Sequence, residues 1–114
     1  MNKKLINLKN AGCAIDSALD RTLNDDEFLL TCINQALVDN NFNDLGDALK
    51  KEDFKAAFEY SHTLKGILAN VGLTPLYDII VQIVEPLRKN NTANLTVKYN
   101  ALIVEKQKLS LLTK

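Results

Sequence analysis

Hydrophobic residues recur every three or four positions along almost the whole chain, and no segment alternates as a strand would. This spacing predicts an all-α protein built from amphipathic helices. A short first helix is indicated by the four-residue spacing of Ile15, Leu19 and Leu23. Asn24 offers a side-chain cap for the helix that follows.

The stretch from residue 25 to residue 50 is apolar along one face but contains three asparagines, Asn40, Asn41 and Asn43. Asparagine has a low helix propensity, so these residues weaken the helical pattern before it resumes. Two interpretations stay open at this point: one long kinked helix, or two shorter helices.

Capping signals divide the second half of the chain. Asp53 is placed to cap a helix that ends at Gly72, because glycine suits the left-handed position beyond a helix. Thr74-Pro75 has the form of a cap followed by proline at the first helical position. Pro86 lies late in this next helix and should kink or shorten its last turn.

A final helix is expected from about residue 93 to residue 112, where leucines recur every seven positions. Short connections between long amphipathic helices favour antiparallel neighbours. We therefore expect an antiparallel up-down-up-down four-helix bundle with an additional short N-terminal helix, forming a single domain over residues 1–114.

The charge balance disfavours two classes of function. Fourteen Lys and Arg residues balance fourteen Asp and Glu residues, which speaks against a nucleic-acid binder and against a polybasic membrane anchor. No apolar run reaches the roughly 18 residues that cross a membrane, and no signal peptide is recognisable. We expect a cytoplasmic protein. Cys13 and Cys32 lack metal-site spacing, and reduced thiols are favoured over a disulfide, which stays open.

The chain has one histidine, His62, which excludes a histidine-rich metal site. At about 100° per residue, Ala57, Leu64 and Leu68 cluster on one side of the predicted helix from 53 to 72, and His62 falls roughly 150° from them. We therefore expect the imidazole on the solvent-exposed face.

Lys65 and Gly66 follow His62 by three and four residues and so share its helix face. A glycine inside a helix costs about 0.5–1 kcal/mol relative to alanine, and close approach of another surface is the usual reason for it. Ala69 adds another small side chain to this helix face, and Phe58 lies between the histidine and the apolar face. This pattern is typical of a nucleophile that another protein reaches while it carries an anion.

One segment reads Ser61-His62-Thr63-Leu64-Lys65-Gly66, and Gly72-Leu73 follows it after five residues. It resembles the HxxKG…G signature of histidine-containing phosphotransfer (HPt) domains. The resemblance covers roughly residues 11 to 90, and the last helix agrees only in length and pattern. The chain departs from the family pattern at Ile67-Leu68, where small residues are usual, and at Ile83-Val84, where a Leu-Glu pair is expected; Glu85 comes one residue late.

The resemblance implies a phosphocarrier in a multistep His-Asp phosphorelay that has no catalytic activity of its own. His62 would accept a phosphoryl group from a receiver-domain aspartate and pass it to another receiver. Lys65 would stabilise the charge of the phosphate, and Gly66 would give the receiver access. The chain would need no cofactor or metal, because the receiver supplies Mg²⁺. The partners would be response-regulator receiver domains and a hybrid sensor histidine kinase, and the protein would be a monomer.

The footprint of the receiver is expected on the helix face around the histidine, on Lys55, Phe58, Glu59, Ala69 and Asn70. Glu59, three residues before His62, is also placed to pair with the imidazole and favour its protonated form.

Other functions fit the same chain. A helical-bundle adaptor that is never phosphorylated would not need His62, Lys65 and Gly66 together. The phospho-accepting domain of a chemotaxis-type histidine kinase keeps the motif in a different setting. A bundle enzyme is disfavoured, because no Glu-x-x-His pairs face one another.

Overall fold

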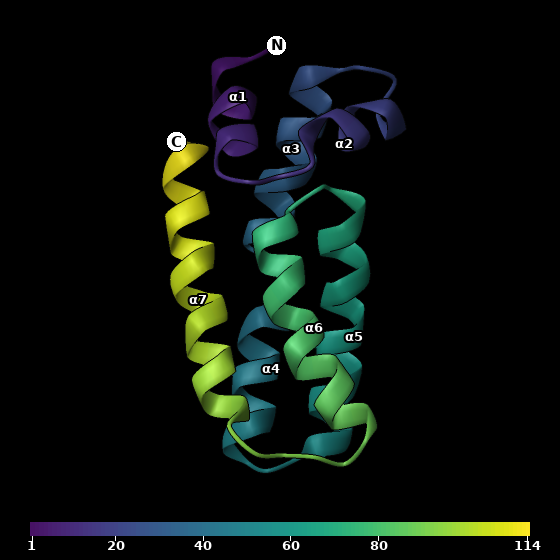
Figure 1. Cartoon of the computed structure of the whole chain (residues 1–114), viewed down its shortest axis with the longest axis vertical. Helices are drawn as coiled ribbons and strands as arrows, with labels where there is room; N and C mark the ends of the chain where they lie inside the picture. The colour runs from purple at the N-terminus through teal and green to yellow at the C-terminus, as the bar shows by residue number, and fades with distance from the viewer.

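The computed structural model describes residues 1–114 and contains seven helices and no strand, which confirms the all-α prediction. The molecule is elongated, 42 × 23 × 20 Å, and its longer helices run along the long axis (Figure 1). They are α1 (Lys3–Asn10), α2 (Ile15–Arg21), α3 (Asp26–Leu37), α4 (Asn41–Lys50), α5 (Phe54–Asn70), α6 (Thr74–Arg88) and α7 (Leu95–Leu112).

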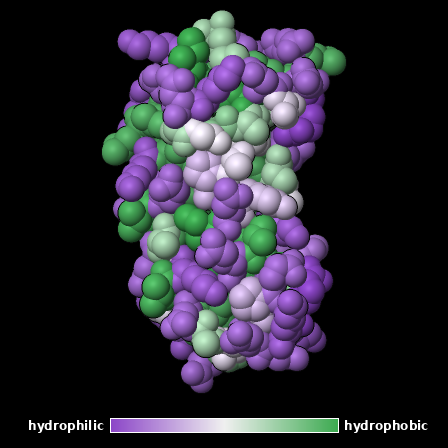
Figure 2. Space-filling view, in the orientation of Figure 1, coloured by the Kyte–Doolittle hydropathy of each residue, from purple (hydrophilic) through white to green (hydrophobic).

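Helices α4 to α7 form a ring, since each packs against the next and α7 also packs against α4. Each contributes fully buried apolar side chains to one continuous core, among them Leu45, Leu64, Ile80 and Leu102. In Figure 1, α5 and α6 meet in a turn at one end of these helices, and α6 and α7 are joined at the other. The face seen in Figure 2 mixes hydrophilic and hydrophobic residues without one large apolar patch.

The stretch from 25 to 50 forms two helices, so the second of the two open interpretations is right. Helix α3 ends before Val38, which is exposed, and α4 begins at Asn41. The Asp39 carboxylate accepts hydrogen bonds from both the backbone and the side-chain nitrogen of Asn41, each at 2.8 Å. A side chain that satisfies free backbone groups in this way stabilises a break between helices.

The N-terminal region holds two short helices, α1 and α2, and not the single additional helix expected. Helix α1 buries only Leu5 and Leu8, too few apolar positions to set a clear period. Helix α2 ends at Arg21, earlier than the apolar spacing suggested. Leu23 lies beyond it with a left-handed backbone and a side chain that is 91% exposed.

The caps differ in part from the expected ones. Asp25, and not Asn24, caps α3 by accepting a hydrogen bond from the backbone nitrogen of Phe28 at 3.0 Å. Asn24 instead adopts a left-handed conformation in the preceding turn. The predicted cap of α5 is confirmed, because Asp53 accepts a hydrogen bond from the backbone nitrogen of Ala56 at 3.2 Å.

The turn between α5 and α6 contains Gly72, whose φ of 76° is in the left-handed region, as expected. Leu73, and not Thr74, is the residue that precedes α6; Thr74 is already helical. The helix continues past Pro86 to Arg88. This turn sets which residues of α5 and α6 lie opposite each other.

Cys13 and Cys32 are free thiols, the first buried and the second half-buried. Burial raises the pKa of the Cys13 thiol from 9.0 to about 11, and the nearby negative charge of Glu105 adds to the effect. The protonated thiol is thus the form that the core accepts. None of the seven helices combines the length and hydropathy needed to span a lipid bilayer.

We expect the free energy of unfolding to fall as the pH rises from about 9 to about 11. The folded protein holds the Cys13 proton more tightly than the unfolded chain, so this contribution is complete below the unfolded pKa and is lost through the folded one. Urea unfolding at about pH 8 and about pH 10.5 measures it. Cys13→Ala should lose less stability over this range than wild type, whereas Cys32→Ala should match wild type. An equal loss in Cys13→Ala and wild type would contradict the assignment.

Candidate functional site

His62 lies in the middle of α5 on its solvent-exposed face, as the periodicity predicted. The opposite face of the helix is defined by side chains that are fully buried in the core, including Ala57, Ser61, Leu64 and Leu68. Because these residues fix the rotation of α5, the imidazole cannot turn inward without exposing the core.

The imidazole stacks on the ring of Phe58, one turn earlier in α5. The two ring centroids are 5.6 Å apart and the ring planes are inclined by 26°. Phe58 is half-buried and packs against the core, so it gives the exposed imidazole a rigid support. The expected pairing of His62 with Glu59 is not present: no hydrogen bond or ion pair joins them.

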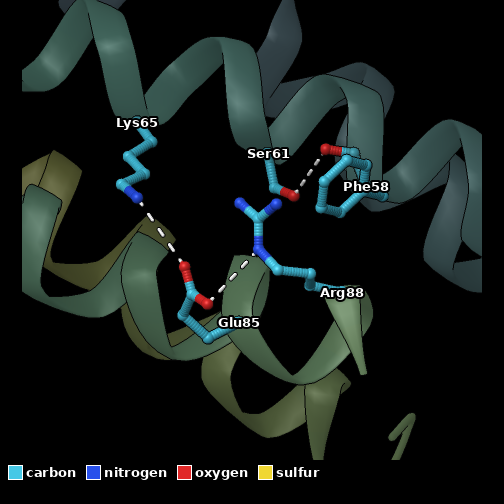
Figure 3. A network of polar contacts seen from close by, with 5 residues as sticks. All are labelled: Phe58, Ser61, Lys65, Glu85 and Arg88. Atoms are coloured by element: carbon cyan, nitrogen blue, oxygen red, sulfur yellow. Dashed lines mark hydrogen bonds and ion pairs between the residues drawn. The ribbon is translucent and has the colours of Figure 1, made fainter. Parts of the chain in front are cut away.

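Ser61 precedes the histidine, but its hydroxyl forms no hydrogen bond with the imidazole. Its side chain is fully buried, and the hydroxyl donates a hydrogen bond to the carbonyl oxygen of Phe58 at 3.1 Å, as Figure 3 shows. The hydroxyl is therefore satisfied within the helix.

Lys65 extends from α5 toward α6, where it meets Glu85. Its Nζ lies 3.7 Å from Glu85 Oε1, and Glu85 Oε2 lies 3.4 Å from Nε of Arg88 (Figure 3). The Arg88 guanidinium also lies over Phe58, 5.2 Å from the ring centroid. Two cations, one carboxylate and the aromatic ring that supports His62 thus form one connected group.

Sequence reasoning did not find the roles of Glu85 and Arg88. These residues lie in α6, and their places opposite α5 depend on the turn at Gly72 and on how the two helices pack. Periodicity within a single helix does not report which residues of two helices meet.

Gly66 is exposed and has open space around it. Apart from the adjacent backbone of its own helix, a Cβ atom built at this position would have no heavy atom within 4 Å. The fold itself therefore gives no steric reason for a glycine here.

The other residues expected at the docking surface fall into two groups on either side of His62. Lys55, Phe58 and Glu59 border a depression of about 590 Å³, which is completed by Phe54 of α5, Leu87 and Arg88 of α6, and Asn90 and Thr92 of the following turn. Of these expected residues, only Phe58 is half-buried; Lys55 and Glu59 are exposed.

Ala69 and Asn70 form the second group, at the C-terminal end of α5, and both are exposed. Their carbonyl oxygens accept hydrogen bonds from Arg21 of α2, at 3.1 Å from Nη2 and 2.9 Å from Nε. A guanidinium at this position donates to the last carbonyls of the helix and complements its negative end. Arg21 thereby ties α2 to the end of α5.

We expect Gly66→Ala to raise the free energy of unfolding by about 0.5–1 kcal/mol, because alanine favours the helix and its methyl group meets nothing. Urea denaturation measures the change. Gly72→Ala is the opposite case: its backbone is left-handed, and the new Cβ would lie 2.6 Å from the carbonyl oxygen of Ala14. That variant should lose about 1–3 kcal/mol or more. Equal effects of the two substitutions would contradict this account of Gly66.

The chain was compared with known proteins and families. No curated protein and no solved structure matches it. A family model described as Hpt domain matches residues 33–102, which is more than half of the chain. The match starts later than the expected resemblance and extends into α7, and it contains His62, Lys65, Gly66, Glu85 and Arg88. The chain therefore belongs to the Hpt domain family, the histidine phosphotransfer domains of phosphorelays.

Proposed function

We propose that the protein is a phosphocarrier of a multistep His-Asp phosphorelay, in which His62 accepts a phosphoryl group from a receiver-domain aspartate and passes it to another receiver. The observation that carries this proposal is the exposed imidazole of His62, supported by Phe58 and flanked by Lys65 and Gly66 on one face of α5, in a chain of the Hpt family.

In the transfer, an unprotonated ring nitrogen of His62 attacks the phosphorus of the aspartyl phosphate. The N–P bond forms as the bond from phosphorus to the carboxylate oxygen breaks, and the electron pair leaves on the receiver's carboxylate. The other ring nitrogen keeps its proton. The same step in reverse gives the phosphoryl group to the second receiver.

Lys65 supports this step by neutralising charge on the phosphoryl group. Its 3.7 Å contact with Glu85 is longer than a charge-assisted hydrogen bond of about 2.7–2.9 Å, so the ammonium is free to turn. Gly66 leaves space beside His62 into which the loops of a receiver fit. Mg²⁺ is supplied by the receiver domain in this proposal.

The proposed receiver footprint is the strip of α5 around His62, formed by Lys55, Phe58, Glu59, Ala69 and Asn70. It is supported by the exposure of Lys55, Glu59, Ala69 and Asn70 and by the depression next to the half-buried Phe58. The two groups flank the histidine, so a receiver that contacts both covers the imidazole.

We further propose that residues 1–114 act as one domain, in which α4 to α7 form the up-down-up-down bundle and the N-terminal helices close one end. The protein would act as a cytoplasmic monomer without catalytic activity of its own. Its partners would be response-regulator receivers and a hybrid sensor histidine kinase, since receivers and kinases are the partners of Hpt domains.

The central test is transfer from a phosphorylated receiver domain in the presence of Mg²⁺. Wild type should gain an acid-labile, alkali-stable phosphate, and His62→Gln should gain none because the chain has no other histidine. Thermal unfolding checks that His62→Gln is folded, which we expect because the side chain is exposed. Absence of label on wild type with several receivers would contradict the proposal and favour an adaptor.

Gly66→Leu should leave the fold intact but slow transfer from the receiver by about tenfold or more, which corresponds to a loss of about 1.4 kcal/mol in docking. The Cβ of the leucine meets no neighbouring side chain, so the fold has room for it, and its bulk lies beside His62 on the surface that the partner approaches. Stopped-flow or quench-flow transfer kinetics measure the rate.

Gln107→Leu is the matched control, because it adds an exposed leucine to α7, which packs against α4 and α6. It should transfer at the wild-type rate. A normal rate for Gly66→Leu would show that the receiver does not approach this strip.

A further inference from the structure

We propose that Glu85 is a positioning residue that lowers the stability of phosphorylated His62 by competing with the phosphoryl group for Lys65 and Arg88. This role rests on the proposed function, since it requires a phosphoryl group on His62. Glu85 would thereby favour transfer of the phosphoryl group from His62 to the next receiver.

Glu85 holds both cations through long, solvent-accessible contacts. The distances are 3.7 Å to Lys65 and 3.4 Å to Arg88, and the three side chains are 29%, 40% and 47% exposed for Lys65, Glu85 and Arg88. Exposed ion pairs of this kind contribute about 0–1 kcal/mol each. Both cations can therefore exchange Glu85 for a stronger anion.

Phe58 contacts both Arg88 and His62. The ring lies 5.2 Å from the guanidinium carbon and 5.6 Å from the centroid of the imidazole. The cation is attracted to the electron-rich ring. Two weak contacts, one with Glu85 and one with Phe58, thus hold Arg88 at the ring that supports the histidine.

A phosphoryl group on His62 changes the competition for these cations. It adds three strong acceptor oxygens that carry negative charge, whereas the carboxylate of Glu85 has two oxygens. Arginine and lysine form their stronger hydrogen bonds with such oxygens. Phosphorylation should therefore draw Lys65 and Arg88 away from Glu85, and breaking the two pairs subtracts from the stability of the phosphorylated state.

A purely structural tie between α5 and α6 does not account for this arrangement. The two helices are already held together by fully buried apolar side chains, among them Leu64, Leu68, Leu76 and Ile80. Only the Lys65–Glu85 pair crosses between the two helices, and one solvent-accessible ion pair adds little next to that interface. The contacts of Glu85 therefore serve to hold two cations, Lys65 and Arg88, at the site.

The test is the equilibrium of phosphate between His62 and a receiver. Wild type and Glu85→Gln are first loaded with potassium phosphoramidate, which phosphorylates histidine without a receiver, and are then equilibrated with the receiver and Mg²⁺. Glu85→Gln should raise the ratio of phosphorylated to unphosphorylated His62 by about two- to tenfold. An equilibrium ratio does not depend on docking rates, and an unchanged ratio would overturn the proposal.

Asp78→Asn is the matched control. It removes one negative charge from the same helix, two turns before Glu85, from an exposed side chain that forms no ion pair. Its ratio should equal that of wild type. An increase as large as that of Glu85→Gln would mean that general charge, and not Glu85, sets the equilibrium.

A double-mutant cycle separates the competition from a direct effect of the Glu85 charge. In a Lys65→Gln, Arg88→Gln background, Glu85→Gln should leave the ratio unchanged, because no cations remain to be held. If it raises the ratio as much as in wild type, Glu85 acts by its own field and the proposal is wrong. Loaded wild type that gives no phosphate to any receiver would instead contradict the proposed function.

Discussion

The packing of α5 against α6 decides where each side chain of the site lies. Fully buried residues such as Leu64 and Ile80 hold the two helices face to face, and this fixes the rotation of α5 so that His62 points to solvent. The turn at Gly72 sets the register, because its left-handed backbone and its contact with Ala14 leave no room for a side chain. Rotation places the histidine, and register places Glu85 beside Lys65 and Arg88 over Phe58.

These two constraints differ in how well a sequence reveals them. Rotation follows from periodicity within one helix, so the exposure of His62 and the buried side of α5 could be predicted from residue spacing alone. Register depends on how two helices meet, which is why the contacts of Glu85 and Arg88 were missed. Helix α1 could not be predicted for a different reason: only Leu5 and Leu8 are buried, so its hydrophobic residues show almost no helical period. Asn24 has a side chain that suits a helix cap, but its backbone is left-handed, and Asp25 caps α3 in its place.

Phe58 links the core to the site. Its ring packs on the core from a half-buried position and also contacts both His62 and Arg88. A side chain anchored in the core gives an exposed imidazole a defined orientation without a hydrogen bond to it. The expected partner, Glu59, would have restrained the ring through its charge and so favoured the protonated form, which cannot attack phosphorus. Support by an aromatic ring avoids that conflict.

The glycines separate what the fold needs from what a partner needs. Gly72 is required by its backbone conformation, and Gly46 of α4 by Tyr99 of α7, whose hydroxyl would lie 2.5 Å from a Cβ at that position. Gly66 has neither reason: its backbone is helical and the space around it is empty. A residue that weakens its own helix by about 0.5–1 kcal/mol, with no neighbour in the chain that requires it, points to a surface outside the chain. Because Gly66 lies one turn from His62 on the same face, that surface is expected to meet the imidazole.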